Sequence, residues 1–146
     1  MDSLDHEGVD AQVAAALRDI LPERWEALER ACARAEGASG GWTTPTPRPD
    51  GTVPFPVAHL DPDAQGLLDE LYPLLVPFDW RSWSAGHQLL DRDLDALAEV
   101  TPVVAVKLVT TLIRADRSTE GTLLGAFESG VMTTLVTCIL RARDAG

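Results

Sequence analysis

The segment IRADRSTEG, residues 113–121, holds the densest run of charged and hydroxyl side chains in the chain. Guanidinium groups bind carboxylates and phosphates through paired hydrogen bonds, so Arg114 and Arg117 could clamp an anionic small molecule or an acidic partner. Asp116 and Glu120 would then orient the two guanidinium groups. This segment is therefore the first candidate for a ligand site.

A purely structural explanation of the same segment stays open. Hydrophobic periodicity predicts a helix on each side of it, which puts the two arginines at the carboxyl end of one helix and Glu120 at the amino end of the next. The helix dipoles favour those charges at those ends. Ser118 or Thr119 is expected to cap the second helix. Asp116 would serve as a partner for an arginine or for a free backbone N–H group.

Thr101 as the cap and Pro102 in the first turn are expected to begin the helix before this segment. This helix, predicted over 103–115, is apolar on nearly every face, which is typical of a central helix. Its polar residues Lys107, Thr111 and Arg114 fall on one stripe, because seven residues bring a helix almost back to the same face. Lys107 is the only lysine, beside eleven arginines. The predicted cationic patch therefore consists of this lysine and the two arginines.

A second candidate is the segment FDWRSW, residues 78–83. Asp79 could simply cap a short helix that holds Arg81 and Trp83, while Phe78 and Trp80 are buried in the core. Alternatively, Asp79, Trp80 and Trp83 could form a wall that faces the two arginines. Such a pocket, with a carboxylate, two guanidinium groups and aromatic surfaces, would suit a planar anionic ligand.

Other constellations point away from metals and cofactors. The run DRDLD, residues 91–95, opens like a calcium loop, but it has Ala96 where a turn glycine is needed and Pro102 where a bidentate glutamate is needed. The three histidines lie far from one another and from the cysteines, and no pair has zinc-ligand spacing. The sequence holds no GxSxG, Walker-type or GxGxxG motif. We expect no metal and no cofactor.

Composition predicts a single domain over 1–146 and disfavours several partners. The formal net charge is −11, with the acidic excess in the first two thirds, so binding of DNA or RNA is not expected. No apolar stretch approaches the roughly 20 residues that span a bilayer, so no membrane segment is expected. Cys32 and Cys138 are expected to be reduced, packed thiols. We predict a cytoplasmic protein, and its many arginines and alanines suggest a bacterial source.

The elements that must position these residues are mainly helical, with six or seven helices. The expected helices cover about 9–21 and 25–36, with a break or kink at Pro22, then 62–72, 94–99, 103–115, 119–129 and 131–143. The Gly/Pro-rich stretch 37–60 contains a PDG turn signal and predicts a small β-hairpin or an ordered extended loop near 41–59. Its prolines would confine any strand to an edge. Residues 1–8 are expected to form a disordered tail.

Three separated stretches, DGTVPFPVAHL, PFDWRSW and LVTTLIRADRSTEGTLLGAFESGVMTTLVTCIL, resemble a small bacterial domain family of unknown function with an FDW..W motif and an RADRF.EG.L motif. The resemblance runs from about Gly41 to Leu140. It implies a fold family, with no activity, cofactor or partner. The residues that carry it in this chain are Phe78, Asp79, Trp80, Trp83, Arg114, Asp116, Arg117, Glu120, Gly121 and Gly130. Ser118 departs from the pattern, which has phenylalanine there, so the corner would be looser or would pack differently.

Two functions of different classes stay open. The first is a small acidic, non-enzymatic binding module that recognises a protein partner or an anionic small ligand, favoured by the Pro-rich segment 43–57 and by the lack of catalytic motifs. The second is a small enzyme acting on an anionic substrate, with Asp79, Asp116 or Glu120 as acid or base and the two arginines as an anion clamp. Such an enzyme would need a carboxyl group with a raised pKa in a cleft. A homodimer formed through the last helix is compatible with both.

Overall fold

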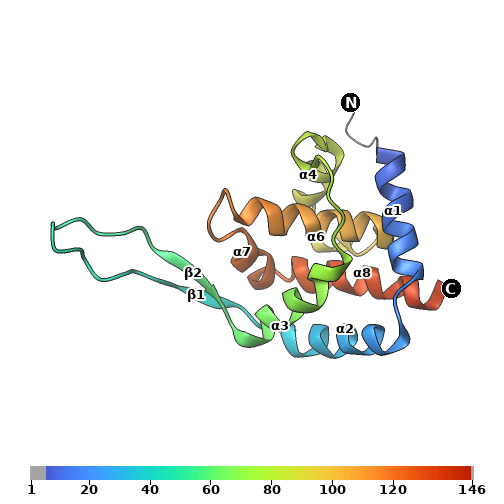
Figure 1. Cartoon of the computed structure of the whole chain (residues 1–146), viewed down its shortest axis with the longest axis horizontal. Coiled ribbons are helices and arrows are strands. Elements are labelled where there is room, and N and C mark those ends of the chain that lie inside the picture. The colour runs from blue at the N-terminus through green and yellow to red at the C-terminus, as the bar shows by residue number, and fades with distance from the viewer. Residues whose placement is uncertain (1–5, 146) are drawn as a thin grey trace.

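The computed structural model describes residues 6–145 and is mainly helical, with one β-hairpin (Figure 1). The predicted fold class is therefore confirmed. Within residues 6–145 the eight α-helices are α1 His6–Arg18, α2 Pro22–Ala35, α3 Pro62–Leu71, α4 Ser84–Leu90, α5 Leu94–Leu97, α6 Pro102–Asp116, α7 Thr122–Glu128 and α8 Val131–Ala145. The strands are β1 Gly40–Thr43 and β2 Val57–Leu60, and Tyr72–Leu74 and Trp80–Ser82 form short 3-10 turns.

Helix α6 lies at the centre and packs against α1, α7 and α8. Nine consecutive residues, 105–113, are buried, which agrees with the prediction of an apolar central helix. Its two buried threonines are satisfied by their own helix, since Thr110 donates to the Val106 carbonyl (2.8 Å) and Thr111 to that of Lys107 (2.9 Å). Thr101 begins the helix as predicted, because its hydroxyl accepts the Val104 N–H.

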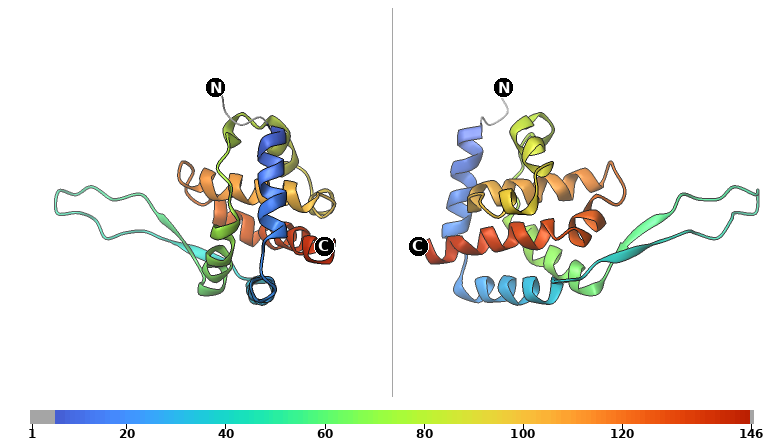
Figure 2. Two further views of the ribbon diagram at one scale, coloured as in Figure 1. Left: turned by 45° about the vertical axis from the view of Figure 1, so that its right-hand side comes forward. Right: turned by 180° about the vertical axis from the view of Figure 1, so that it is seen from behind.

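Strands β1 and β2 pair in antiparallel register, with Gly40 opposite Leu60 and Thr43 opposite Val57. The chain between them turns at the predicted PDG sequence, where Gly51 has a φ of 89° and donates its N–H to the Arg48 carbonyl. Residues 40–60, which we call the arm, project away from the helical body in every view (Figures 1 and 2). The helices therefore form the body, and the arm extends from it.

The amino-terminal residues differ from expectation. Residues 6–8 were predicted to belong to a disordered tail, but they form the first turn of α1. The physical reason is Val9, which is 1% exposed and, with Val13 and Leu17, forms the buried face of this helix. The rest of the predicted tail, residues 1–5, lies outside the described part of the chain.

Helix α4 was not predicted, because its sequence SAGHQLL lacks a clear apolar periodicity. Tertiary packing explains it. A Cβ atom at Gly86 would lie 2.1 Å from the ring of Trp83, so the indole packs directly on the backbone of this helix. Among residues 6–145, no single helix is long and apolar enough to cross a membrane; α7 and α8 reach that criterion only when counted together across a 77° bend.

Candidate functional site

The predicted corner, residues 113–121, joins α6 to α7 and also holds the base of the arm. Asp116 accepts a hydrogen bond from the Leu123 N–H in the first turn of α7 (3.0 Å). Ser118 and Thr119 do not cap α7, contrary to prediction, because the chain enters the helix through Gly121 with a left-handed φ of 92°. Asp116, seven residues before Leu123, supplies the capping oxygen instead, which is one of the two structural roles expected for it.

The arm is fixed to this corner by two contacts. Glu120 accepts a hydrogen bond from the Ala58 N–H of β2 through Oε1 (2.8 Å). The indole of Trp42 lies so close to Gly121 that a Cβ atom there would be 2.5 Å from its Cζ2. Gly121 therefore serves both the backbone turn and the close approach of Trp42. A third contact steadies the base of the arm, because Asp61 accepts the Ser39 N–H (3.1 Å) rather than capping α3.

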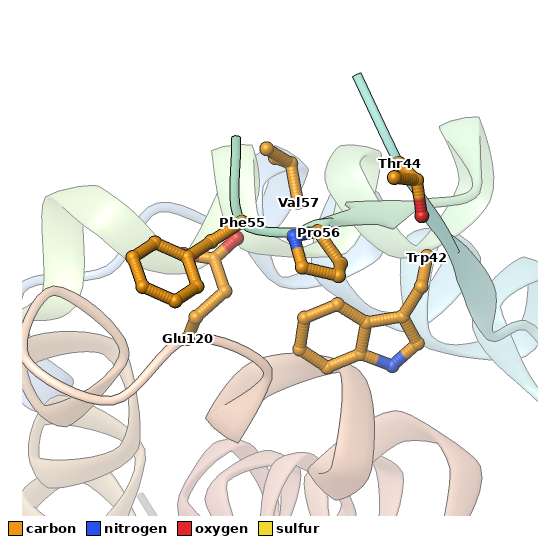
Figure 3. Close-up of a pocket in the computed structure, with 6 residues that line it drawn as sticks. All are labelled: Trp42, Thr44, Phe55, Pro56, Val57 and Glu120. Carbon is orange, nitrogen blue, oxygen red and sulfur yellow. The ribbon is translucent and has the colours of Figure 1, made fainter. Parts of the chain in front are cut away.

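Between the arm and the corner lies a hollow of about 710 Å³, shown in Figure 3. We call it the arm hollow, and its lining residues are Trp42, Thr44, Phe55, Pro56, Val57 and Glu120. Its walls are mainly apolar, and Glu120 is the only charged residue among the six. Phe55 is 91% exposed and Trp42 is 54% exposed. The hollow therefore offers accessible aromatic surface beside one carboxylate.

The predicted cationic patch is divided by the fold. Lys107 is only 3% exposed, and its ammonium group binds the Asp10 carboxylate at 2.9 Å. Its Nζ also lies 4.3 Å from the ring centroid of Trp83 and 5.4 Å from that of Phe78. Lys107 is therefore enclosed by an aromatic pair and a carboxylate, which we call the lysine cage.

The two arginines of the predicted patch lie outside this cage. Arg114 is half-buried and Arg117 is exposed, and within residues 6–145 neither of them forms an ion pair. Arg114 and Arg117 are thus available to solvent, but the lysine that was expected to complete their patch is not.

The FDWRSW segment supports the lysine cage through Trp83 and Phe78, whose rings meet edge to face at 5.7 Å. Asp79 is exposed and accepts the Ser82 hydroxyl within its own turn. Trp80 is half-buried and stacks with Arg81, whose Cζ lies 5.2 Å from the ring centroid. Of the three side chains predicted to form a wall facing the two arginines, Trp83 therefore packs on Lys107 instead, and Asp79 and Trp80 take no part in the lysine cage.

Two further hollows do not join the FDWRSW segment to the corner. One, of about 380 Å³, lies between β2, α3 and α7, with Asp116, His59 and Tyr72 in its lining. The other, of about 930 Å³, lies among α1, α2, α8 and the start of α6. In the described part of the chain no three His, Cys, Asp or Glu side chains are grouped so that they could hold a metal ion.

The sequence interpretation did not single out Trp42 and Phe55, which line the arm hollow. The sequence signal that could have found them was the combination of bulky apolar side chains with little charge, one acid and one base across residues 37–60.

Comparison with known proteins adds a family but no activity. A family model described as a family of unknown function (DUF6508) matches residues 20–145. Neither a curated protein nor a solved structure matches the chain.

Proposed function

Because the chain belongs to this family of unknown function, we propose its function from its own residues: it is a non-enzymatic binding module that docks a basic protein partner through the arm. One observation carries the proposal. Of the seven large apolar side chains exposed among residues 6–145, four lie on the arm, and they are Trp42, Val53, Phe55 and Val57. Aromatic residues of this kind are the usual anchors of protein interfaces.

The build of the arm supports this role. An isolated two-stranded hairpin is only marginally stable in water, so an exposed one gains from a surface that covers it. The base of the arm is already fixed by Glu120 and by the contact between Trp42 and Gly121. A partner therefore meets a pre-oriented element and loses less conformational entropy on binding than it would with a free loop.

The prolines of the arm favour recognition through side chains over addition of a strand. Pro45, Pro47, Pro54 and Pro56 lack the N–H groups that a pairing strand would need. On β2, the Ala58 N–H is already donated to Glu120. Both features interrupt the backbone pairing that an added strand would need, so we expect the apolar side chains to provide the contact.

Charge selects the class of partner. The chain carries a formal net charge of −11, whereas residues 37–60 carry one acid and one base. A basic protein would be attracted to the acidic body, and the nearly neutral arm adds no repulsion of its own. A second copy of this chain would bring another −11 and would be repelled at long range, which disfavours a homodimer through the arm.

The alternatives of an enzyme or of an anion-binding module have weaker support. Asp116 and Glu120 each use an oxygen to bind a backbone N–H group, and Lys107 is enclosed in the lysine cage. An anion clamp would then rest on Arg114 and Arg117 alone. We also propose a cytoplasmic location, because both cysteines are free and buried, as is usual in a reducing compartment. A bacterial source stays part of the proposal.

The test uses a photo-crosslinking phenylalanine derivative placed at Val53 on the arm and, as a matched control, at exposed Leu94 on the body. The protein captured only from position 53 is purified and titrated by calorimetry against the parent, Phe55→Ser and Leu94→Ser. We expect Phe55→Ser to weaken binding by roughly thirtyfold, the cost of losing one aromatic anchor, and Leu94→Ser to leave it unchanged.

Three results would overturn the proposal. The first is equal binding by the parent and Phe55→Ser. The second is an equal loss with Leu94→Ser. The third is a crosslink only to another copy of this chain, which sedimentation would reveal as a homodimer.

A further inference from the structure

We infer that the arm hollow binds a lysine or arginine side chain of the partner, between the rings of Trp42 and Phe55 and beside the Glu120 carboxylate. This inference rests on the proposed function, because it assigns the chemistry by which the arm selects a basic protein. The hollow has an apolar lining for the methylene stem and a single negative charge for the head group. Lysine and arginine are the side chains that combine those two features.

The two rings suit a cation. A Trp or Phe face attracts an ammonium or guanidinium group through the negative charge of its π system, with Trp the stronger. Figure 3 shows Trp42 and Phe55 on opposite sides of the hollow, with Pro56 between them. An entering side chain would pack its stem against Pro56 while its charged end meets the rings.

Glu120 supplies the charge that a purely apolar hollow would lack. Its Oε1 accepts the Ala58 N–H at 2.8 Å, which orients the carboxylate and leaves Oε2 available to a ligand. Arg117, three residues earlier, forms no ion pair with it within the described residues 6–145. The negative charge of Glu120 is therefore not neutralised by its nearest arginine in sequence.

The same chemistry already holds a lysine inside this protein. In the lysine cage, Nζ of Lys107 lies over Trp83 at 4.3 Å and over Phe78 at 5.4 Å, and it binds the Asp10 carboxylate at 2.9 Å. The arm hollow repeats this set of one indole, one phenyl ring and one carboxylate on the surface. The difference is that the cage is filled by a residue of its own chain, whereas the hollow is open.

The experiment follows the indole N–H signal of Trp42 in proton–nitrogen correlation spectra of the whole chain. The probes are N-acetyl-lysine methylamide, its arginine counterpart and the uncharged N-acetyl-norleucine methylamide, each titrated to tens of millimolar. We expect the two cationic probes to shift the Trp42 signal at concentrations roughly threefold to tenfold lower than norleucine, which is the contribution of an exposed cation–π contact plus one carboxylate.

The variant Glu120→Gln removes the charge but keeps an oxygen that can accept the Ala58 N–H. We expect it to abolish the preference for the cationic probes, and we expect Glu128→Gln, an equal charge change at an exposed residue of α7 outside the hollow, to preserve it. An unchanged Trp42 signal in the free Glu120→Gln variant verifies that the arm is still seated.

The inference is overturned if norleucine binds as well as lysine, if no probe shifts Trp42, or if Glu120→Gln retains the preference. Failure here is distinct from failure of the proposed function. If Phe55→Ser still loses the protein partner while the probes show no preference for cations, the arm docks a partner through apolar contact alone. If Phe55→Ser binds the partner like the parent, the arm is not the docking element.

Discussion

Replacing Asp10 by asparagine is expected to destabilise the protein more than replacing Lys107 by methionine. The carboxylate of Asp10 is 48% exposed, but its partner ammonium group is only 3% exposed. Asp10→Asn keeps the shape and one acceptor oxygen, and it leaves a buried cation without an anionic partner. Lys107→Met removes the cation itself and covers the rings of Phe78 and Trp83 with an apolar chain of similar length.

The magnitudes follow from the contacts. Removing one partner of a fully buried ion pair costs about 3–5 kcal/mol; the Asp10 side chain is half-exposed and asparagine keeps an oxygen for the ammonium group, so Asp10→Asn should lower the free energy of unfolding by about 1–2 kcal/mol. For a domain of this length that corresponds to a fall in Tm of roughly 3–6 °C. Lys107→Met loses a cation–π contact of about 1 kcal/mol but no longer buries a charge, so its net cost should be about 0–1 kcal/mol.

Urea unfolding at neutral pH, followed by circular dichroism, measures how much each substitution lowers the free energy of unfolding. The variant that carries both substitutions completes a double-mutant cycle. Once Lys107 is methionine, changing Asp10 to asparagine should cost less than about 0.5 kcal/mol, because nothing is left for the carboxylate to neutralise. The reasoning would be refuted by a Lys107→Met variant less stable than Asp10→Asn, and equally by additive costs in the double variant.

Three further outcomes are expected. Gly121→Ala should lower the free energy of unfolding by about 1–2 kcal/mol, because position 121 has a left-handed φ. It should also displace Trp42, which a shift of the Trp42 indole N–H signal would show. Gly37→Ala is the control: its φ of 76° is similar but the space around it is open, so the Trp42 signal should not move. The pKa of Asp50 lies below the usual aspartate range, because the Thr52 hydroxyl and N–H both bind its carboxylate. The stability that the ionised Asp50 carboxylate gives the turn should be fully present above the usual aspartate pKa and should be lost as the pH falls through the lowered pKa of Asp50. A carbon NMR titration measures that pKa, and a Thr52→Val variant in which the pKa of Asp50 does not rise would contradict this explanation. Burial raises the pKa of the thiols of Cys32 and Cys138 and so lowers the fraction of reactive thiolate. A thiol-specific reagent at mildly alkaline pH should therefore label the folded chain at least about tenfold more slowly than the chain unfolded in urea. Equal labelling rates would show that the thiols are accessible in the folded chain.

The fold could be predicted from the sequence because its signals are local. Apolar periodicity located the long helices, Thr101 with Pro102 located the start of α6, and the PDG sequence located the turn of the arm. Helix α4 escaped because it depends on contact between the Trp83 ring and the backbone at Gly86. Such a contact becomes evident only once the chain is folded.

The candidate site was harder to predict, because helix periodicity gives a shared face but does not tell which partner covers it. Lys107 and Arg114 do lie on one stripe of α6, yet Lys107 is covered by Trp83 and by an aspartate 97 residues away in sequence. Exposure of Trp42 and Phe55 is equally non-local. Trp42 lies in the short strand β1 and Phe55 lies between two prolines, and neither position tells whether the ring is covered. Only the direction in which the arm leaves the body exposes them.

The corner fixes the base of the arm, so its residues hold together the site that we propose nearby. Asp116 holds the start of α7, Gly121 lets the chain turn under Trp42, and Glu120 ties down β2. Glu120 then belongs to two functions at once, because the carboxylate that positions the arm also charges the hollow beneath it. The two are separable, since seating needs only an acceptor oxygen at that position, while attraction of a cation needs the negative charge. Glu120→Gln would therefore keep the arm in place and remove the proposed preference for basic partners. Glu120→Ala would remove that preference and would also loosen the attachment of the arm.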